Sequence, residues 1–133
     1  MIQFFVASKP MSTQTGTVIN VNGRRMPLRR NPQFSKDCRA AAIKDRNEKG
    51  WAMLLGPVSM GVTIYIQRNK KHRHEIYSMS GADVLNILKG PMDAIQGVVY
   101  ADDKQVVNFH RLEKLWTNDG NGVPGLEVDF RAA

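Results

Sequence analysis

The sequence predicts an α/β or α+β domain with one mixed β-sheet of about four strands, two main helices and an extended basic arm. Residues 57–67 alternate apolar and polar side chains, as a β-strand does. Residues 31–50 and 83–96 space their apolar side chains as helices do. A chain of 133 residues is long enough for one core and too short for two. We therefore expect one domain over residues 1–133.

The first strand and the arm come from the N-terminal residues. Residues 2–7 are partly aromatic and β-branched, which is typical of a strand. Residues 12–20 are rich in Thr and Val, and Asn22-Gly23 is a strong tight-turn signal, so a hairpin is expected here. Four arginines follow: Arg24, Arg25, Arg29 and Arg30. Guanidinium groups pair bidentately with phosphate oxygens, which favours a phosphate-binding arm; a solvated loop is the alternative.

The first helix is expected to begin at Asn31-Pro32, since Asn is a good N-cap and Pro fits the first turn. Phe34 and Cys38 point to the core on this pattern, and Gly50 ends the helix. The single cysteine is predicted to be a small buried thiol, which fits a reducing cytoplasm. Residues 51–55 are apolar and indicate core or subunit contact.

The clearest strand spans residues 57–67, with a period of two and one face buried. It leads into a second basic cluster, formed by Arg68, Lys70, Lys71 and Arg73. His72 and His74 lie within this cluster, but so cationic a loop repels a metal ion. Phosphate contact or plain solvation is favoured instead.

The second helix is expected to start at Asp83, with a kink or a split at Pro91 because an interior proline removes a backbone hydrogen bond. Leu85, Leu88, Met92 and Ile95 form its apolar stripe. Strands are expected over residues 105–115 and 126–130, separated by a turn rich in Gly and Asn.

Charge is divided unevenly along the chain, whose net charge is +7. Residues 1–82 hold 14 Lys and Arg against 4 Asp and Glu, whereas residues 83–133 hold 5 against 8. This favours a polyanion that is held by one part and processed by the other. No apolar run is long enough for a membrane span, and the N-terminus lacks the basic region of a signal peptide.

Acidic residues gather where the second helix and the following strand begin. Asn86, Lys89 and Asp93 share one helical face by their spacing. Asp83 precedes that helix, and Asp102-Asp103 precede the strand. Carboxylates in this arrangement favour a divalent cation held against a phosphate. Each acid also has a structural alternative, namely a helix cap, a surface charge or a polar turn.

This stretch resembles the RusA-type Holliday-junction resolvases. The resemblance is carried by Asp83-Val-Leu-Asn86-Ile-Leu-Lys89, Asp93-Ala-Ile, and the run from Gly97 through Asp102-Asp103 to Gln105-Val-Val. It implies a homodimeric endonuclease that nicks four-way DNA junctions symmetrically with Mg²⁺ or Mn²⁺. It also implies a role in DNA recombination or repair, an origin in bacteria or phages, and a cytoplasmic location.

By position, the resemblance implies catalytic roles for Asp83, Lys89 and Asp103 and metal binding by Asp83, Asp102 and Asp103, with Asn86 and Asp93 in support. Leu85 departs from the family's pattern, which often has another aspartate there, and its spacing assigns it to the apolar stripe. Two alternatives stay open: a catalytically weak or inactive junction-binding protein, and a broader branched-DNA or flap nuclease. An RNA-binding module is disfavoured, because the aromatic strand motif of sheet-surface RNA readers is missing.

Overall fold

A computed structural model gives the fold, and it describes residues 1–12, 15–29, 33–118 and 122–133, with the backbone alone described for 15–21 and 25–29. The elements are β1 (Ile2–Val6), β2 (Thr15–Val21), β3 (Arg24–Arg29), α1 (Gln33–Lys49), β4 (Val58–Ile66), α2 (Val84–Ala94), β5 (Val106–Trp116) and β6 (Gly125–Ala132). Short 3₁₀ turns span Lys70–His72 and Asp103–Gln105. In these ranges no helix has the length and apolar character needed to cross a membrane.

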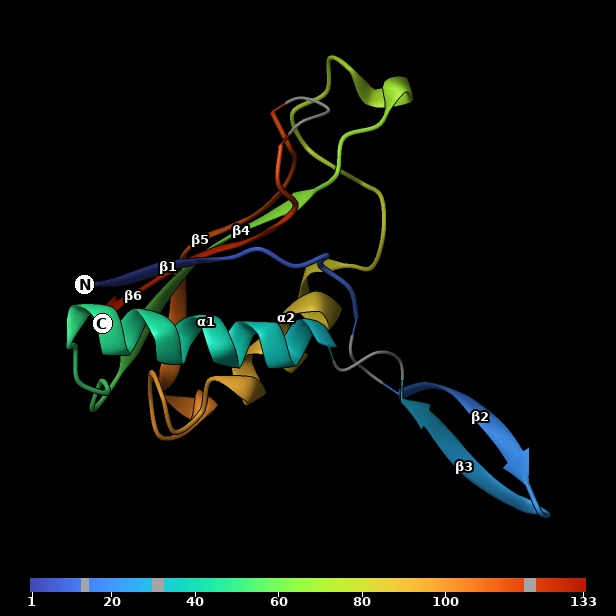
Figure 1. The fold of residues 1–133 in the computed structure, drawn as a ribbon, viewed down its shortest axis with the longest axis horizontal. Coiled ribbons are helices and arrows are strands. Elements are labelled where there is room, and N and C mark those ends of the chain that lie inside the picture. Colours follow the sequence, from blue (N-terminus) through green and yellow to red (C-terminus); the bar gives the residue numbers. More distant parts are fainter. Residues whose placement is uncertain (13–14, 30–32, 119–121) are drawn as a thin grey trace.

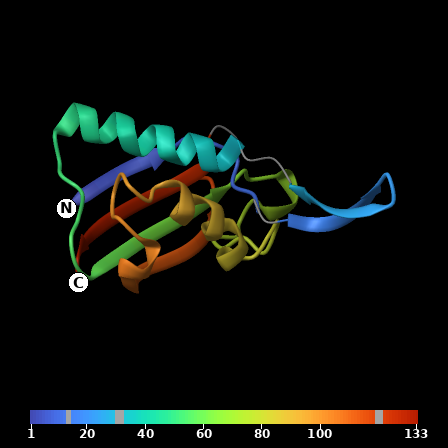
Figure 2. The ribbon, with the colours of Figure 1, turned by 90° about the horizontal axis from the view of Figure 1, so that it is seen from below.

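Four strands form one mixed sheet in the order β1-β6-β4-β5. The β1–β6 and β6–β4 pairs are antiparallel, whereas β4 and β5 are parallel. A parallel pair needs a crossover connection, and the segment containing α2 supplies it. Both helices lie on the same side of the sheet (Figures 1 and 2). The predicted α+β fold, with a four-stranded mixed sheet and two helices, is confirmed.

The core lies between this sheet and the two helices. Val58, Met60, Val62 and Ile64 of β4 are fully buried, in one cluster with Phe34 of α1 and with residues of α2. Each such side chain contributes about 1.5–3 kcal/mol on burial. The alternation of β4 therefore supplies the central row of the core.

The opposite face of β4 is also buried, which corrects the expectation of one buried face. Ser59 is 4 % exposed and Thr63 is 2 % exposed, and Gly61 between them is buried as well. The physical reason is that β4 is a central strand. Its polar side chains bond to polar groups of β5 on one side and of β6 on the other.

The hairpin arm projects away from the domain (Figure 1). β2 pairs antiparallel with β3, with Val21 opposite Arg24. Asn22 and Gly23 both have positive φ, 52° and 77°, as the tight turn requires. The predicted hairpin is confirmed, and Arg24 is exposed at its tip.

Helix α1 buries Phe34 and Cys38, as predicted, and also Ala42. Its predicted start at Asn31-Pro32 lies outside the described residues. Burial, and then the charge of Asp37, raises the pKa of the Cys38 thiol to about 12, which leaves it an unreactive core group. Beyond Gly50 (φ 73°), Trp51 and Leu54 pack against the core.

Helix α2 narrows one expectation and corrects another. It runs without a break through Pro91, so of the kink or split expected there the split is excluded. Leu85 is 69 % exposed, whereas Leu88 and Ile95 of the same predicted stripe are buried. Val84 and Ile87 of the same first turn pack against the core, so Leu85 lies at the edge of the buried face of α2.

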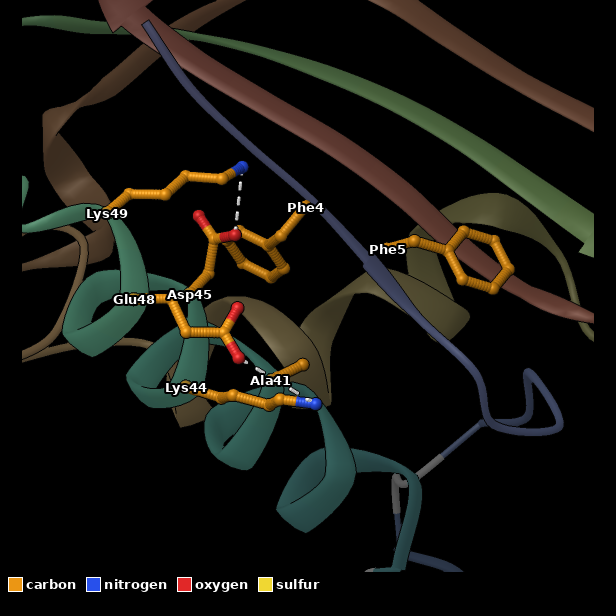
Figure 3. Close-up of a pocket in the computed structure, with 7 residues that line it drawn as sticks. All are labelled: Phe4, Phe5, Ala41, Lys44, Asp45, Glu48 and Lys49. Carbon is orange, nitrogen blue, oxygen red and sulfur yellow. Dashed lines mark ion pairs between the residues drawn. The ribbon is translucent and has the colours of Figure 1, made fainter.

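A hollow between α1 and β1 is lined by two aromatic side chains and by paired charges (Figure 3). Lys49 Nζ lies 2.9 Å from Asp45 Oδ1, and Lys44 Nζ lies 4.0 Å from Glu48 Oε1. Asp45 also accepts a hydrogen bond from Trp51 Nε1 at 2.9 Å. The two ion pairs lie within α1, whereas the Trp51 bond ties α1 to the segment that follows it, and Lys49 Nζ donates to the carbonyl of Gln3 in β1 at 3.0 Å. The hollow is therefore part of the scaffold.

Candidate active site

The turn before β5 is fixed by the side chain of Gln105. Its Oε1 accepts hydrogen bonds from the backbone N–H groups of Ala101 (2.8 Å) and Asp102 (3.1 Å). Its Nε2 donates to the carbonyls of Leu54 (3.1 Å) and Gly56 (3.0 Å). The turn is thus closed on itself and tied to the loop before β4, which sets where its acidic side chains lie.

A cleft of about 520 Å³ opens between α2 and the start of β5. Its charged lining is Lys89, Asp93 and Asp103, and its apolar lining includes Leu85, Met92 and Phe109. Leu85, Lys89 and Asp93 follow one another at intervals of four residues, so each lies about 6 Å further along the axis of α2. The cleft therefore has an apolar end, a cation in the middle and an acidic end.

The acidic end centres on Asp103, which interacts with two other aspartates. The carboxyls of Asp93 and Asp102 both lie within hydrogen-bonding reach of the Asp103 side chain. Desolvation, followed by these contacts and the two neighbouring negative charges, raises the pKa of Asp103. The backbone N–H of Lys104 donates to Asp102 Oδ1 at 2.9 Å, and this bond is the main reason that the pKa of Asp102 is lowered.

Gln96 bridges the two sides of this acidic end. Its Oε1 accepts a hydrogen bond from the backbone N–H of Asp103 at 3.2 Å. Its Nε2 lies 3.4 Å from Oδ1 of Asp93 and 3.4 Å from the carbonyl oxygen of the same residue. One side chain therefore sets the separation of the end of α2 from the turn before β5.

The C-terminal end of α2 is held by two further side chains. Arg39 of α1 donates from Nη1 to the carbonyls of Ala94 (2.8 Å) and Gln96 (2.9 Å). The hydroxyl of Tyr100, a fully buried residue, donates to the carbonyl of Met92 at 2.8 Å. Helix ends leave carbonyls without intrahelical partners, and a cation there also complements the helix dipole. These bonds fix the part of α2 that carries Asp93.

Asp83 lies at the other end of the helix, where it is the N-cap as predicted. Its Oδ1 accepts from the backbone N–H of Asn86 at 2.8 Å, and its Oδ2 accepts from Nδ2 of the same asparagine at 3.1 Å. Ten residues separate it from Asp93, about 15 Å along the helix. Asp83 does not line the cleft, so the predicted set of Asp83, Asp102 and Asp103 is not gathered at one point.

The acidic end fits a hard divalent cation that is only partly enclosed by protein. Within the described ranges, no three His, Cys, Asp or Glu side chains are grouped so that they could hold a metal ion. Mg²⁺ is usually bound through one or two carboxylates and completes its coordination with water and substrate phosphate. The crowded carboxyls of Asp93 and Asp103 supply such a pair, and a cation there would relieve their repulsion.

The predicted DNA-binding residues lie on the hairpin arm and on the loop after β4. Arg24 of the arm and Lys70, Lys71 and Arg73 of the loop are exposed. The side chains of Arg25 and Arg29, and the whole of Arg30, fall outside what the structure describes. Arg68 differs from the others, because its guanidinium donates to the carbonyls of Thr117 (2.7 Å), His72 (2.5 Å) and Glu75 (2.8 Å). Arg68 therefore stabilises the conformation of the loop. The exposed cations of the loop are Lys70, Lys71 and Arg73.

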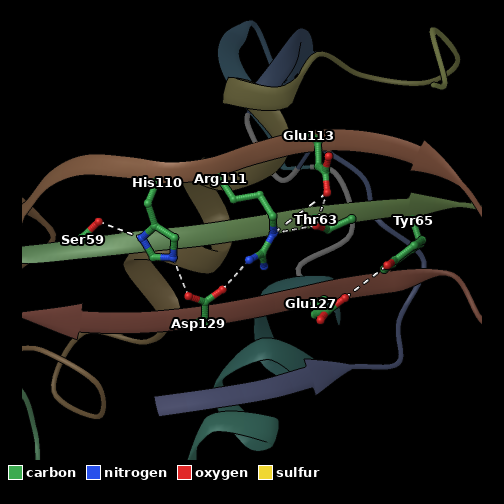
Figure 4. A network of polar contacts seen from close by, with 8 residues as sticks. All are labelled: Ser59, Thr63, Tyr65, His110, Arg111, Glu113, Glu127 and Asp129. Atoms are coloured by element: carbon green, nitrogen blue, oxygen red, sulfur yellow. Dashed lines mark hydrogen bonds and ion pairs between the residues drawn. The ribbon is translucent and has the colours of Figure 1, made fainter. Parts of the chain in front are cut away.

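A second polar cluster covers the sheet face opposite the helices (Figure 4). His110 Nε2 lies 2.5 Å from Asp129 Oδ2, and Arg111 Nη1 lies 2.7 Å from Asp129 Oδ1. His110 Nδ1 lies 2.7 Å from the hydroxyl of Ser59, which donates to Asn108. The Ser59 hydroxyl proton is thus donated to a side chain of β5. The cluster joins β4, β5 and β6.

Carboxylates able to hold divalent cations are found in many nuclease sites, and here Lys89 lines the same cleft. The family described as Endodeoxyribonuclease RusA matches residues 7–129. The chain therefore belongs to the RusA endodeoxyribonuclease family, and membership implies Holliday-junction resolvase activity. The chain is also similar to the uncharacterized protein YqaN of Bacillus subtilis (strain 168), with 26 % identity over 98 % of this chain and 95 % of that protein.

Several residues of the cleft were not predicted from the sequence. Phe109 lines the cleft, Gln96 joins the two segments that carry its acidic residues, and Arg39 of α1 holds the end of α2. The position of Gln96, three residues after Asp93 and just before Gly97, is a usable local signal. The contact of Arg39 with carbonyls more than 50 residues away has no local signal at all.

Proposed function

We propose that this chain is a divalent-cation-dependent endonuclease that resolves four-way DNA junctions by paired, symmetrical nicks. The observation that carries the proposal is the contact of Asp103 with Asp93 and Asp102 in a cleft that also holds Lys89. Membership of the RusA family supplies the class of substrate. The cleft supplies the residue types that cutting a phosphodiester needs.

Each side chain of the cleft has a distinct part in the proposed chemistry. Asp93 and Asp103 would hold Mg²⁺ or Mn²⁺, with the exposed Asp102 beside them. When bound, such an ion lowers the pKa of water and neutralises charge on a phosphate. Lys89 brings a positive charge to the phosphate being cut. Gln96 and Gln105 keep the two segments that carry the acids in register. The resemblance gives Asp83 a catalytic part as well, and this remains a prediction.

The exposed cations would hold the DNA backbone outside the cleft. The net charge of +7 favours a polyanion, and phosphate contacts orient DNA without reading its sequence. We assign these contacts to the arm, through Arg24, Arg25, Arg29 and Arg30, and to the loop, through Lys70, Lys71 and Arg73. Arg68 contributes by shaping the loop.

A homodimer follows from the symmetry of the substrate. A four-way junction offers two equivalent strands, and two copies of one cleft related by a two-fold axis would reach both. Paired nicks at symmetrical positions are the product that this arrangement gives.

Cleavage of synthetic four-way junctions tests the proposal, with the parent protein compared with Asp103→Asn and Lys89→Ala. In Mg²⁺ or Mn²⁺ the parent should give paired nicks, and each variant should lose about 100-fold or more in rate while still binding the junction. Glu48→Gln, on the exposed face of α1, is the matched control and should behave as the parent. Parental cutting by Asp103→Asn would contradict the proposal.

A junction-binding protein without nuclease activity is the second candidate, and two observations favour it: Leu85 stands where an acid is common, and the described residues gather no three-ligand site. Binding without cleavage in either metal would support it. Equal cutting of flaps and junctions, with linear duplex left intact, would instead indicate a broader branched-DNA nuclease.

A further inference from the structure

Two exposed apolar side chains line the same cleft as the charged residues. Leu85 of α2 is 69 % exposed, and Phe109 of β5 is 38 % exposed. Single exposed apolar residues are ordinary on protein surfaces. These two are different, because separate elements bring them into one cleft, where Leu88 and Met92 back them from the core side.

The order of residues along α2 gives the cleft a direction. Leu85 lies one turn before Lys89, about 6 Å along the axis, and Asp93 lies one turn beyond. Phe109 of the edge strand β5 is in register with Met60 of β4, and the side chain of Met60 lies in the core between the sheet and the helices. Because residues in register on neighbouring strands point to the same face of the sheet, Phe109 also faces the helix side. The apolar wall of Leu85 and Phe109 is therefore continuous with the charged part of the cleft.

A nucleotide has the same division, with a charged phosphate at one end and an apolar base face at the other. A phosphate beside Lys89 leaves its own base or the adjacent base within reach of an apolar wall. In an intact duplex that base is stacked between its neighbours and is not available. At a branch point a base can be unstacked at lower cost, and aromatic and aliphatic side chains are the usual partners of unstacked bases.

We propose that Leu85 and Phe109 form a wall that receives an unstacked base beside the phosphodiester to be cut, and that this contact makes cleavage selective for branched DNA. The inference rests on the proposed nuclease function and adds to it the feature of the substrate that the cleft recognises. It also gives the exposed Leu85 a use that depends on its being apolar.

The test uses a four-way junction with 2-aminopurine beside the nicked position, together with a linear duplex of matched sequence. The variants are Leu85→Ala and Phe109→Ala. Leu55→Ala and Met79→Ala are controls, since these residues are 81 % and 95 % exposed and do not line the cleft. Fluorescence is read on binding in EDTA, and single-turnover cleavage is read in Mg²⁺.

The parent should show a rise in fluorescence on binding the junction, and both cleft variants should reduce that rise while the controls keep it. Junction cleavage by the cleft variants should fall by roughly 5- to 150-fold, the range that removal of one base-stacking side chain gives. Cutting of the linear duplex should change little, so selectivity should fall with rate.

The possible results separate this inference from the proposed function. A fluorescence rise that the cleft variants lose, in a protein that does not cut, supports the wall and overturns the nuclease. A parent that cuts junctions while the variants keep both the fluorescence rise and the selectivity overturns the wall. Faster junction cutting by Leu85→Asp would also overturn it, because that result would show a position that needs an acid. A parent that neither cuts nor changes the fluorescence overturns both.

Discussion

The carboxyl groups of Asp93 and Asp103 lie within hydrogen-bonding reach of each other, although one is on the last turn of α2 and the other lies beyond the Gly97 turn. Three neighbours hold them there: Gln96 between them, Arg39 on the carbonyls of the helix end and Gln105 under the turn. Two like-charged groups are thus kept together by uncharged contacts and by a cation on the backbone. The repulsion between the two carboxylates lowers the stability of the folded protein, and a bound cation would remove that repulsion.

The first prediction concerns the stability of Asp103→Asn without metal. The pKa of Asp103 is raised in the folded protein, so its ionised form opposes folding at neutral pH, and this cost disappears as the pH falls through the folded pKa. The variant should therefore melt about 1–2 °C above the parent at neutral pH. Millimolar Mg²⁺ should raise the melting temperature of the parent and leave that of the variant unchanged. Glu48→Gln is the control, and an equal response of all three proteins to Mg²⁺ would argue against a cation at this site.

The second prediction separates the two parts assigned to Asp83. Asparagine is as good an N-cap as aspartate, so Asp83→Asn should keep the stability of the parent, whereas Asp83→Ala should lose about 1 kcal/mol. If Asp83 acts in catalysis, both variants should lose junction nicking and keep junction binding. Chemical denaturation and the nicking assay give the two readouts. Parental nicking by Asp83→Asn would leave this residue with a capping part alone.

Local chemistry made much of the fold predictable. The Asn22-Gly23 turn, the Asp83 cap and the alternation of β4 each depend on neighbours in sequence, and each was predicted from the sequence. Leu85 was assigned wrongly to the core because the buried face of α2 is centred on Ile87, Pro91 and Ile95, and a spacing of three or four residues does not fix that centre. Leu85 lies at the edge of this face, so its side chain is left in the cleft.

The site was predictable only in part for a related reason. Lys89 and Asp103 were found through their spacing and their resemblance to a family, and the structure brings both to one cleft. The partnership of Asp103 with Asp93 instead depends on the Gly97 turn, which folds the chain back so that the end of α2 meets the start of β5. Contacts such as Arg39 with Ala94 span 55 residues, and no local pattern reports them.

The third prediction is that Gln96 positions the acids without touching the substrate. Outer hydrogen-bond partners of metal ligands typically contribute about 10- to 100-fold in metal affinity or activity. Gln96→Ala should accordingly need more Mg²⁺ for half-maximal nicking, with a smaller change in the rate at saturating Mg²⁺. Gln33→Ala, on the exposed start of α1, is the control. A lower rate at every Mg²⁺ concentration, with no shift in the midpoint, would contradict a positioning part.

The fourth prediction concerns acid stability and the cluster on the other face of the sheet. Burial works to raise the pKa of Asp129, but hydrogen bonds from His110 and Arg111 outweigh it and leave this pKa below its usual value. A lowered pKa contributes stability that is present above the unfolded value and is lost as the pH falls through the folded one. Asp129→Asn should cost about 1.5–3 kcal/mol at neutral pH, the usual contribution of a hydrogen bond to a charged group. Urea midpoints of parent and variant, measured from about pH 6 to pH 3, should converge at the acid end. A constant difference over this range would rule out the charge of Asp129 as the cause.

The fifth prediction tests why Gly61 stands in the middle of β4. A Cβ atom built there would overlap the carboxylate of Asp129 and lie 2.5 Å from Nε2 of His110, closer than real Cβ atoms approach other groups. Gly61→Ala should therefore force these two side chains apart and destabilise the protein by about 1–3 kcal/mol, as overpacking does. Adding His110→Ala should recover part of that loss, because it removes one of the overlapping groups, and a double-mutant cycle from urea unfolding measures the recovery.

Gly56→Ala is the matched control for this cycle. Its added Cβ meets nothing within 4 Å, but its φ of 76° makes any side chain there strained. The loss in Gly56→Ala should thus be independent of His110, and its cycle should give additive free energies. Additive free energies in the Gly61 cycle as well would mean that the glycine is needed for its backbone and not to leave room for the contact between His110 and Asp129.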